Sequence, residues 1–265
     1  MISAIDRERI DTVLHGKEFR RIMRYAGEAV VKYRMITDGE RILLGVSGGK
    51  DSLTLLHVLR QLQARAPIDF EIVAVTFDPQ FSGFNSAVIQ EYCNDLGVEH
   101  HVVSLDMRQI LLEKSAEKHP CVLCSRLRRG MLYKTAQENG ADKIALGHNL
   151  DDVAISFLIS LFRGQGLTTM GPNVPGDGGL CRVIRPLSAV NEGWIRSVAS
   201  ALEYPDAGRC HYEQQLSEKG DRAYFGKLLA SLEQRIPNVR RHILQSLGDV
   251  KGDYLLDLKF LTNLF

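Results

Sequence analysis

The chain has 265 residues, of which 45% are hydrophobic and 25% are charged, a composition typical of a globular protein with one sizeable core. With 33 basic against 32 acidic residues, the bulk charge predicts no nucleic-acid binding outside a local patch, and five cysteines do not indicate a disulfide scaffold. No apolar run approaches the ~18 residues of a membrane span, and residues 1–20 are too charged for a secretory signal, so we expect a cytoplasmic protein without a membrane partner.

The first half of the chain alternates between predicted helices and strands. Apolar residues at helical spacing predict a helix over 17–35, whose other face carries Arg20, Arg21 and Arg24. A solvated basic face is favoured there over an RNA-binding one. Strands are predicted over 42–46, 70–77, 99–104 and 143–146, with helices after residue 52 and over 85–96, 107–116 and 125–139. This order predicts an α/β fold with a parallel sheet sandwiched by helices and with ligands at the carboxyl ends of its strands.

The second half of the chain is predicted to be mostly helical. Helices are expected over 149–162, 192–202, 218–236 and 239–248, and a connector rich in Gly, Pro and Asn over 164–179 leads to a strand over 181–184. Residues 254–265 are apolar without a clear period, so they could pack on the body or across a homodimer, which is the assembly we expect. We divide the chain into an N-terminal helical segment, 1–36, an α/β domain, 37–188, and a C-terminal helical region, 189–265.

A glycine-rich turn joins the first strand to the helix after it, and it reads Ser47-Gly48-Gly49-Lys50-Asp51-Ser52. Two consecutive glycines place no Cβ between the backbone and a ligand, so N–H groups can point at anionic oxygens. The following helix adds its positive dipole end, Lys50 adds a cation, and the two serines add hydroxyls. The turn is not a Walker loop, which has four residues between its glycines and Ser or Thr after the lysine. We therefore predict a phosphate cradle of another kind.

The six residues of this turn resemble the pyrophosphate loop of the N-type ATP pyrophosphatases, the PP-loop superfamily. These enzymes cleave ATP between the α and β phosphates to adenylate a carbonyl oxygen. The alternative is an ordinary glycine turn between a strand and a helix. All six positions match in the required strand–turn–helix context, which favours the nucleotide-binding interpretation.

Polar residues also follow two other predicted strands. Asp78 lies just past the second strand, where it could contact a ribose or a metal ion or merely cap a loop. Gly147 and His148 lie just past the fourth strand and are expected to face the nucleotide. Asp151 and Asp152 open the next helix, where the helix dipole alone favours acidic residues. Their place beside Gly147 nevertheless favours a functional role.

Two cysteines with metal-ligand spacing, Cys121 and Cys124, follow Pro120 and open a helix. Two thiolates in this arrangement suit a metal, an iron–sulfur cluster or a redox pair. Cys93 and Cys181 are interpreted as structural, which leaves Cys210, in a loop between helices, as the candidate third ligand. Three cysteines suggest a [4Fe–4S] cluster with one open iron. A structural zinc that also uses His211 is the alternative, and the residues alone leave the two nearly balanced.

Together these motifs closely resemble the tRNA 2-thiocytidine synthetase (TtcA) family. The likeness covers about residues 19–210 and is carried by the turn at 47–52, the segment 121–130, the segment 144–152 and Ile184-Arg185-Pro186-Leu187. It implies a PP-loop domain that uses ATP and Mg²⁺, and a [4Fe–4S] cluster on Cys121, Cys124 and Cys210. It also implies thiolation of a cytidine at anticodon-loop position thirty-two of tRNA to 2-thiocytidine, with sulfur from a cysteine desulfurase or another sulfide donor.

One departure from the family pattern and two alternative families accompany the resemblance. The third cysteine of bacterial members lies in a Pro-Cys-x-x-Cys-Gly setting, whereas Cys210 stands alone between Arg209 and His211. The related tRNA 2-thiouridine synthetases are one alternative, but they carry paired zinc ribbons that this chain has too few cysteines to build. A PP-loop ligase that acts on a small molecule is the other.

The expected site combines catalytic residues, nucleotide-binding residues and basic residues near the cysteines. Catalytic roles are assigned to Lys50, Asp51, Asp151 and Cys210, and either of the two aspartates is expected to position Mg²⁺. Nucleotide binding is assigned to Ser47, Gly48, Gly49, Lys50, Asp51, Ser52, Asp78, Gly147, His148 and Asp152. The arginines next to the cysteine pair are expected to contact RNA or AMP, because they cover more than one helix face: Arg126, Arg128 and Arg129.

Overall fold

The structure is a computed structural model, and it describes residues 4–113, 120–179, 181–208 and 220–260. Its centre is a six-stranded sheet with the strand order β3-β2-β1-β4-β6-β5. All neighbouring strands are parallel except β5 and β6, which pair antiparallel. The strands are β1 Arg41–Gly45, β2 Glu71–Asp78, β3 Glu99–Ser104, β4 Lys143–Ala145, β5 Asn173–Pro175 and β6 Arg182–Ile184. The predicted α/β fold with a parallel sheet is thereby confirmed.

The sheet is buried on both faces because its central strands are apolar at nearly every position. Leu43, Val73 and Ile144 belong to the cluster on one face. Their neighbours Ile42 and Leu44 point the other way, into the larger cluster. The side chains alternate because successive residues of a strand face opposite sides of the sheet. The two faces therefore form two separate hydrophobic layers.

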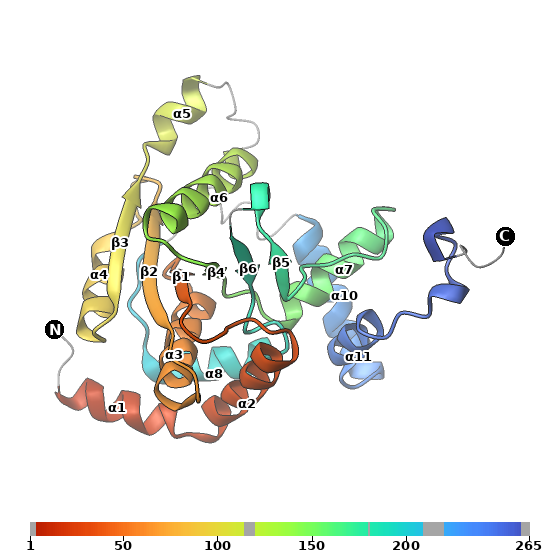
Figure 1. Cartoon of the computed structure of the whole chain (residues 1–265), viewed down its shortest axis with the longest axis horizontal. Coiled ribbons are helices and arrows are strands. Elements are labelled where there is room, and N and C mark those ends of the chain that lie inside the picture. The colour runs from red at the N-terminus through yellow and green to blue at the C-terminus, as the bar shows by residue number, and fades with distance from the viewer. Residues whose placement is uncertain (1–3, 114–119, 180, 209–219, 261–265) are drawn as a thin grey trace.

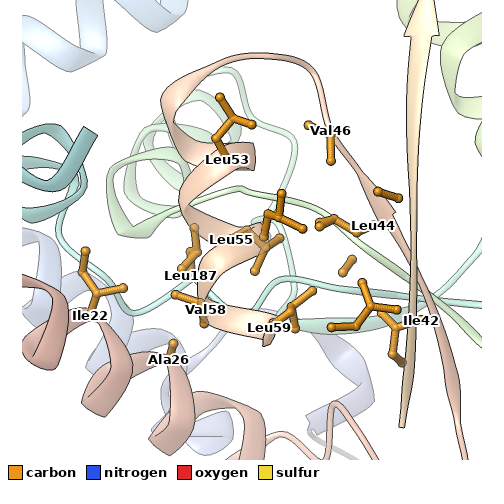
Figure 2. Packing of buried hydrophobic residues seen from close by; sticks show 14 of the residues in the cluster. Ile22, Ala26, Ile42, Leu44, Val46, Leu53, Leu55, Val58, Leu59 and Leu187 are labelled. Atoms are coloured by element: carbon orange, nitrogen blue, oxygen red, sulfur yellow. The ribbon is translucent and has the colours of Figure 1, made fainter. Parts of the chain in front are cut away.

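Helices cover each layer. The larger layer is formed with α2 Lys17–Lys32, α3 Lys50–Arg65, α4 Ser86–Asp95 and α8 Glu192–Leu202, and α1 Ala4–Leu14 packs on α8 and α2. Figure 2 shows Ile22 and Ala26 of α2 facing the buried side of α3. The other layer is covered by α6 Pro120–Glu138, on which α5 Met107–Glu113 packs. In Figure 1, α5 and α6 lie at the top and α1, α2, α3 and α8 at the bottom.

A third group of helices lies beyond the β5 edge of the sheet, at the right of Figure 1. It contains α7 Leu150–Phe162, α10 Asp221–Arg235 and α11 Val239–Leu247, which pack through Ala154, Leu158, Phe225, Leu229 and Val239. Short 3₁₀ helices lie at η1 Asp177–Gly179, η2 Gly252–Tyr254 and η3 Leu258–Phe260. No helix in the described part of the chain is both long and apolar enough to cross a membrane.

The structure differs from the sequence predictions in three elements. Helix α1 and strand β5 were not predicted, because α1 has little amphipathic character and β5 reads Asn-Val-Pro inside a segment rich in Gly, Pro and Asn. Helix α6 begins at Pro120 rather than at residue 125, since proline is well tolerated in the first turn of a helix. Cys121 and Cys124 therefore lie inside its first turns.

Candidate active site

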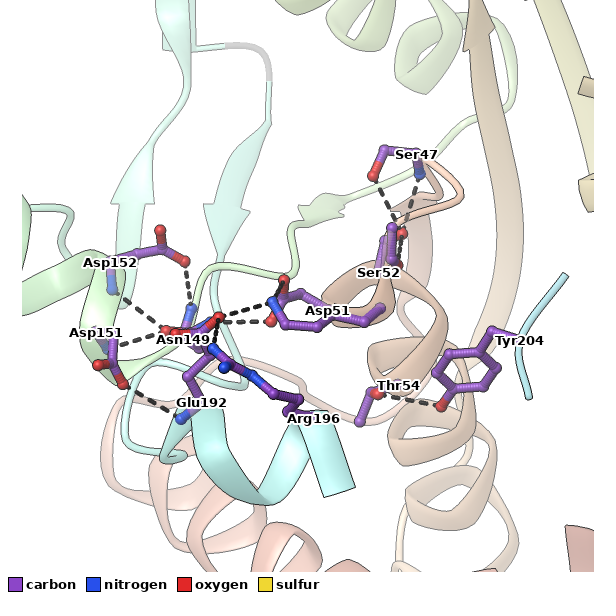
Figure 3. Close-up of polar contacts among 12 residues, drawn as sticks. Ser47, Asp51, Ser52, Thr54, Asn149, Asp151, Asp152, Glu192, Arg196 and Tyr204 are labelled. Atoms are coloured by element: carbon purple, nitrogen blue, oxygen red, sulfur yellow. Dashed lines mark hydrogen bonds and ion pairs between the residues drawn. The ribbon is translucent and has the colours of Figure 1, made fainter. Parts of the chain in front are cut away.

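The phosphate-loop candidate lies where the order of the strands reverses. From β1 the chain continues to β2 on one side, while β4 lies on the other side. Such a switch point leaves a crevice at the carboxyl ends of the strands. Ser52 Oγ in the first turn of α3 accepts a hydrogen bond from Ser47 N at 3.1 Å and donates one to Gly49 O at 2.9 Å. This side chain closes the loop onto its own helix (Figure 3).

Two glycines let the loop be clamped from both sides. Gly48 has φ +80°, and a Cβ on it would lie 2.8 Å from Ala207 Cβ and 3.0 Å from Ile89 Cδ1. A Cβ on Gly147 would lie 3.0 Å from Asp51 C and from Ser52 N. Helix α3 has Gly49 as its N-cap, without a side-chain capping bond. Its first N–H groups thus lack a capping side chain, which suits an anionic ligand.

Lys50 is held by two carboxylates. Its Nζ lies 2.7 Å from Asp51 Oδ2 and 2.9 Å from Glu192 Oε1. Burial alone would lower the pKa of Lys50, but the hydrogen bonds and charges of Asp51 and Glu192 outweigh it and raise the pKa above its ordinary value. Arg196 contacts the same Glu192 oxygen at 3.2 Å. The lysine is therefore a fixed cation at the mouth of the loop.

Asn149 connects the loop to α7. Its Oδ1 caps that helix by accepting from Asp151 N at 2.9 Å and from Asp152 N at 3.2 Å. Its Nδ2 donates to Asp51 Oδ1 at 2.9 Å, and the residue is only 3% exposed. Since both ends of this buried amide are satisfied, Asn149 sets the position of Asp51 relative to α7 (Figure 3).

The two aspartates of α7 connect it to other helices. Asp151 Oδ2 accepts from Glu192 N at 3.2 Å, and its other oxygen forms an ion pair with Arg240, in which both side chains are largely buried. Asp152 Oδ2 accepts from Asn149 N at 3.0 Å, and its other oxygen pairs with Arg222. Their roles toward nucleotide and metal stay predictions. The described contacts of these two aspartates hold α7, α8, α10 and α11 together.

Asp78 and His148 also lie at the carboxyl edge of the sheet. Asp78 has the contacts of a loop cap, because its two oxygens accept from Gln80 N at 2.8 Å and from Ser86 Oγ at 2.6 Å. His148 Nδ1 lies 3.3 Å from Arg185 Nε, so it accepts a hydrogen bond. Burial lowers the pKa of His148 to about 4, and nearby arginines act in the same direction against Asp152. His148 is thus neutral near pH 7. A nucleotide contact for either residue stays a prediction.

The segment after α8, residues 203–208, crosses the loop as a strap. Tyr204 OH lies 3.1 Å from Thr54 Oγ1 of α3, and Ala207 O accepts from Asn85 N at 2.8 Å. Gly208 pairs with Phe84 in an isolated bridge. The strap, α8 and the loop border a cleft of about 690 Å³, whose charged lining residues are Lys50, Arg196, Glu203 and Asp206. Two basic and two acidic side chains therefore face this cleft.

Comparisons with known proteins agree with this geometry. The PP-loop domain family matches residues 20–204. A tRNA-cytidine(32) 2-sulfurtransferase from Deinococcus radiodurans is 43% identical over 239 residues, which cover 89% of this chain and 79% of the relative. One from Geobacter sulfurreducens is 41% identical over 242 residues, or 91% of this chain and 94% of the relative. The chain belongs to the tRNA-cytidine(32) 2-sulfurtransferase family. The resemblance stated from the sequence is confirmed.

A solved structure shares the fold of this 2-sulfurtransferase family member. It is the U34-tRNA thiolase NcsA from Methanococcus maripaludis with its [4Fe–4S] cluster, which superposes with a TM-score of 0.70 and covers 93% of this chain and 88% of its own. The two sequences are 21% identical. At this identity the likeness concerns the fold alone.

The cysteines of this 2-sulfurtransferase family member fall into two groups. Cys93 and Cys181 are buried, and burial raises the pKa of the Cys93 thiol to about 12, as a structural role requires. Cys124 is half-buried in the second turn of α6. Cys210 and the side chain of Cys121 lie outside the described residues, so the predicted ligand set stays a prediction. Next to the pair, the side chains of Arg126, Arg128 and Arg129 are exposed, and Arg129 lies 3.7 Å from Asp177.

Sequence reasoning missed two residues of the site, Asn149 and Glu192. Asn149 had a usable signal, because Asn followed three residues later by an acidic residue before an apolar run is the pattern of a helix cap. Glu192 had none. It reaches Lys50 only because α8 packs on α3, which no local pattern indicates.

Proposed function

We propose that this chain replaces the C2 oxygen of a tRNA cytidine by sulfur, at the expense of ATP, to give 2-thiocytidine at anticodon-loop position thirty-two. Family membership supports the reaction class. The observation that carries the proposal is the clamped loop at the switch point of the sheet, with an uncapped helix N-terminus and a fixed lysine facing one crevice. An enzyme that activates a carbonyl with ATP needs such a group of donors.

In this proposal the loop holds the β and γ phosphates of ATP. The backbone N–H groups of residues 48–52 and the ammonium of Lys50 bind the phosphate oxygens. Mg²⁺ usually takes one or two carboxylates plus phosphate oxygens and water as ligands. Both carboxylates have partners, Lys50 and Asn149 for Asp51 and Arg240 for Asp151, and Asp51 is favoured because it lies in the loop itself.

The chemistry follows from where charge develops. The C2 carbonyl oxygen of the unstacked cytidine attacks the α phosphorus, and pyrophosphate leaves with the negative charge. Lys50 and the dipole of α3 stabilise that charge as it forms. Sulfide then replaces the adenylated oxygen at C2, and AMP leaves. Anticodon loops present the splayed bases that both steps require.

The sulfur-handling side is proposed on the cysteine chemistry. As the family resemblance implies, Cys121, Cys124 and Cys210 would hold a [4Fe–4S] cluster, since the other two of the five cysteines, Cys93 and Cys181, are buried in the core. Bound there, such a cluster supplies an iron with an open coordination position for sulfide. The strap supports a common location for the ATP-binding loop and the cysteines, because Ala207, three residues before Cys210 in the sequence, lies against Gly48. We further propose a cysteine desulfurase or another sulfide source as donor, and a homodimer in the cytoplasm.

The test uses the whole chain, purified anaerobically, with unfractionated tRNA, ATP and sulfide. We expect 2-thiocytidine in the tRNA, AMP and pyrophosphate as co-products, and an iron–sulfur absorption spectrum. Lys50→Ala should lose AMP formation and retain the spectrum. Cys124→Ala should lose iron and thiolation but still bind ATP. Thiouridine as the product would favour the uridine branch, and AMP formation that needs no tRNA would favour a small-molecule ligase.

Replacing Cys210 tests the third ligand. If Cys210→Ala retained full iron content and thiolation, the third ligand would be another residue. A zinc-containing protein without the absorption spectrum would contradict the cluster but leave the ATP-binding loop in place.

A further inference from the structure

A second cleft, of about 300 Å³, lies on the side of α7 that faces α10. It is formed by α7, the segment 165–170 and the start of α10. Its lining includes the apolar side chains of Ile159 and Met170 and polar residues such as Ser156, Gln165 and Thr168. A small cleft lined by apolar side chains and a few polar groups suits one planar, hydrogen-bonding ring.

The wall of the cleft is held in place by its own hydrogen bonds. Ser160 Oγ donates to Gly166 O at 3.1 Å, and Thr169 Oγ1 donates to Val153 O at 2.6 Å. Both bonds fasten the loop after α7 back onto that helix. These hydrogen bonds therefore fix the side of the cleft that α7 and the segment 165–170 form.

The surroundings combine exposed aromatic rings with exposed basic groups. Phe162 and Tyr224 are each 65% exposed, although aromatic side chains of this size are usually covered. Lys227 and Arg163 are exposed close by in sequence, and Arg222 lines the cleft itself. Arg163 pairs with Asp221 and Arg222 with Asp152, so phosphates would have to take the place of these carboxylates. Aromatic faces for stacking together with cations for phosphates are the usual composition of a surface for single-stranded nucleic acid.

The cleft lies beside the proposed reaction centre but not in it. Asp152, Ser156 and Ser160 are spaced four residues apart, so they lie on one face of α7, about 6 Å apart along its axis. Arg222 both pairs with Asp152 and lines the cleft. Asp152 in turn contacts Asn149, which bonds Asp51 of the loop. An unstacked neighbour of the reacting nucleotide can span such an offset.

From this arrangement we propose that the cleft binds one unpaired RNA base next to the reacting cytidine, and we name it the flanking-base pocket. The inference rests on the proposed function. Ile159 and Met170 pack on the face of the base, Gln165 and Thr168 bond its edge, and Arg163 and Arg222 contact the adjoining phosphates. The pocket thereby fixes which loop nucleotide is presented to the ATP-binding loop.

The experiment measures binding of synthetic anticodon stem–loop RNAs in which one loop base at a time is replaced by an abasic site. With the unchanged protein, loss of one base beside the reacting cytidine should raise Kd about 5- to 100-fold, the range for a stacked base. Ser156→Phe, which fills the pocket, should raise the Kd of the complete RNA by a similar factor. In this variant the abasic site should cause no further change in Kd. Ser231→Phe, at an exposed position further along α10, is the matched control and should behave as the unchanged protein.

A second variant tests the pocket without inserting a large side chain, in case Ser156→Phe does not fold. Gln165→Ala with Thr168→Val changes only exposed loop positions, removes the groups that bond the base edge, and should reduce the abasic effect several-fold. The pocket assignment is wrong if no abasic site weakens binding, or if the filled variant retains both wild-type Kd and wild-type sensitivity. Because binding needs no turnover, failure of the pocket leaves thiolation intact, whereas failure of thiolation leaves the abasic pattern measurable.

Discussion

The two sides of the active site are held together by different forces. On the side of the phosphate loop, backbone atoms approach so closely that Gly48 and Gly147 have no space for a Cβ without displacing a neighbour. On the side of α7, α10 and α11, charged side chains make the connections, through the pairs of Asp151 with Arg240 and Asp152 with Arg222. Backbone clamps fix a geometry, while ion pairs respond to pH, salt and bound charge.

This contrast matches the demands of the two proposed substrates. In-line attack on a phosphorus depends on positioning, and misplacement by about 1 Å can lower the rate on the order of 100-fold. An RNA loop, in contrast, brings its own charges, which can exchange with ion pairs at the protein surface. The rigid side therefore suits the nucleotide and the charged side suits the RNA.

The largest effect is expected where the clamp is tightest. Gly48→Ala places a methyl group 2.8 Å from Ala207 Cβ at a positive φ, so loop and strap must separate. We expect loss of AMP formation by more than about 100-fold and a loss of unfolding free energy of about 2–4 kcal/mol. ATP-dependent AMP release and urea unfolding measure the two effects.

Gly39→Ala is the matched control for that variant. Gly39 has nearly the same φ, +78°, but no atom lies within 4 Å of the added Cβ. It should therefore show only the cost of the positive φ, about 1 kcal/mol, with normal AMP formation. Equal stability losses for the two variants would show that the strap does not clamp the loop.

The next effect tests the charged side at its most buried pair. The side chains of Arg240 and Asp151 are only 16% and 14% exposed, so Arg240→Met leaves the buried carboxylate of Asp151 without its partner, together with the more exposed Glu233. We expect a loss of about 3 kcal/mol in unfolding free energy. The double variant with Asp151→Asn should recover part of it, because the buried unpaired charge is then removed and only the more exposed Glu233 is left without Arg240. A double variant that is merely additive would mean that the pair itself is not what joins α7 to α11.

The same contrast explains what the sequence could and could not predict. The loop and its strands were predictable, because continuous apolar runs and Ser47-Gly48-Gly49-Lys50-Asp51-Ser52 are local patterns with one structural solution. Element boundaries agree within a few residues for most of the chain. Family membership followed from several such motifs in the right order.

The charged side was not predictable in the same way. Asp151 and Asp152 were recognised as important residues, but their partners Arg240 and Arg222 come from helices far along the chain. Ion pairs of this kind depend on tertiary packing, which leaves no periodic signal in the sequence. For the same reason, no sequence pattern indicated that Glu192 contacts Lys50. The strap was not predictable either, because its conformation is set by contacts with Thr54 and Asn85.

A smaller effect concerns pH and the support beneath the loop. His57 of α3 is 1% exposed, its Nε2 bonds Tyr92 OH at 2.7 Å, and it stacks on Tyr204 of the strap. Burial lowers its pKa from 6.5 to about 3, so below pH 6.5 the unfolded chain binds a proton that the folded chain does not. Stability is therefore lost as the pH falls, by about 2 kcal/mol for this group between about pH 7 and pH 5.

Urea midpoints measured across that pH range test whether stability falls with pH and whether His57 is the group responsible. His57→Phe should flatten the dependence of stability on pH, although His100 and His148, whose pKa values are also lowered to about 4, keep part of it. Tyr92→Phe retains the histidine and should lower the midpoint at every pH while keeping the slope. A slope that survives unchanged in His57→Phe would assign the pH dependence to other groups.

The smallest effect on stability is expected at the exposed ion pair between α7 and α10. This pair tests whether charge without burial is enough to hold the helices together. Arg163 and Asp221 form a two-pronged pair at 2.7 and 3.1 Å between α7 and α10, with side chains 59% and 41% exposed. Water and salt screen such a pair, and holding two long side chains in one geometry offsets much of its attraction. Asp221→Asn should therefore leave the urea midpoint nearly unchanged at low salt and wholly unchanged at high salt. A loss of stability comparable to that of Arg240→Met would mean that charge alone, independent of burial, holds α10 against α7. Exposed ion pairs would then fix the geometry on this side as firmly as the backbone contacts do at the phosphate loop.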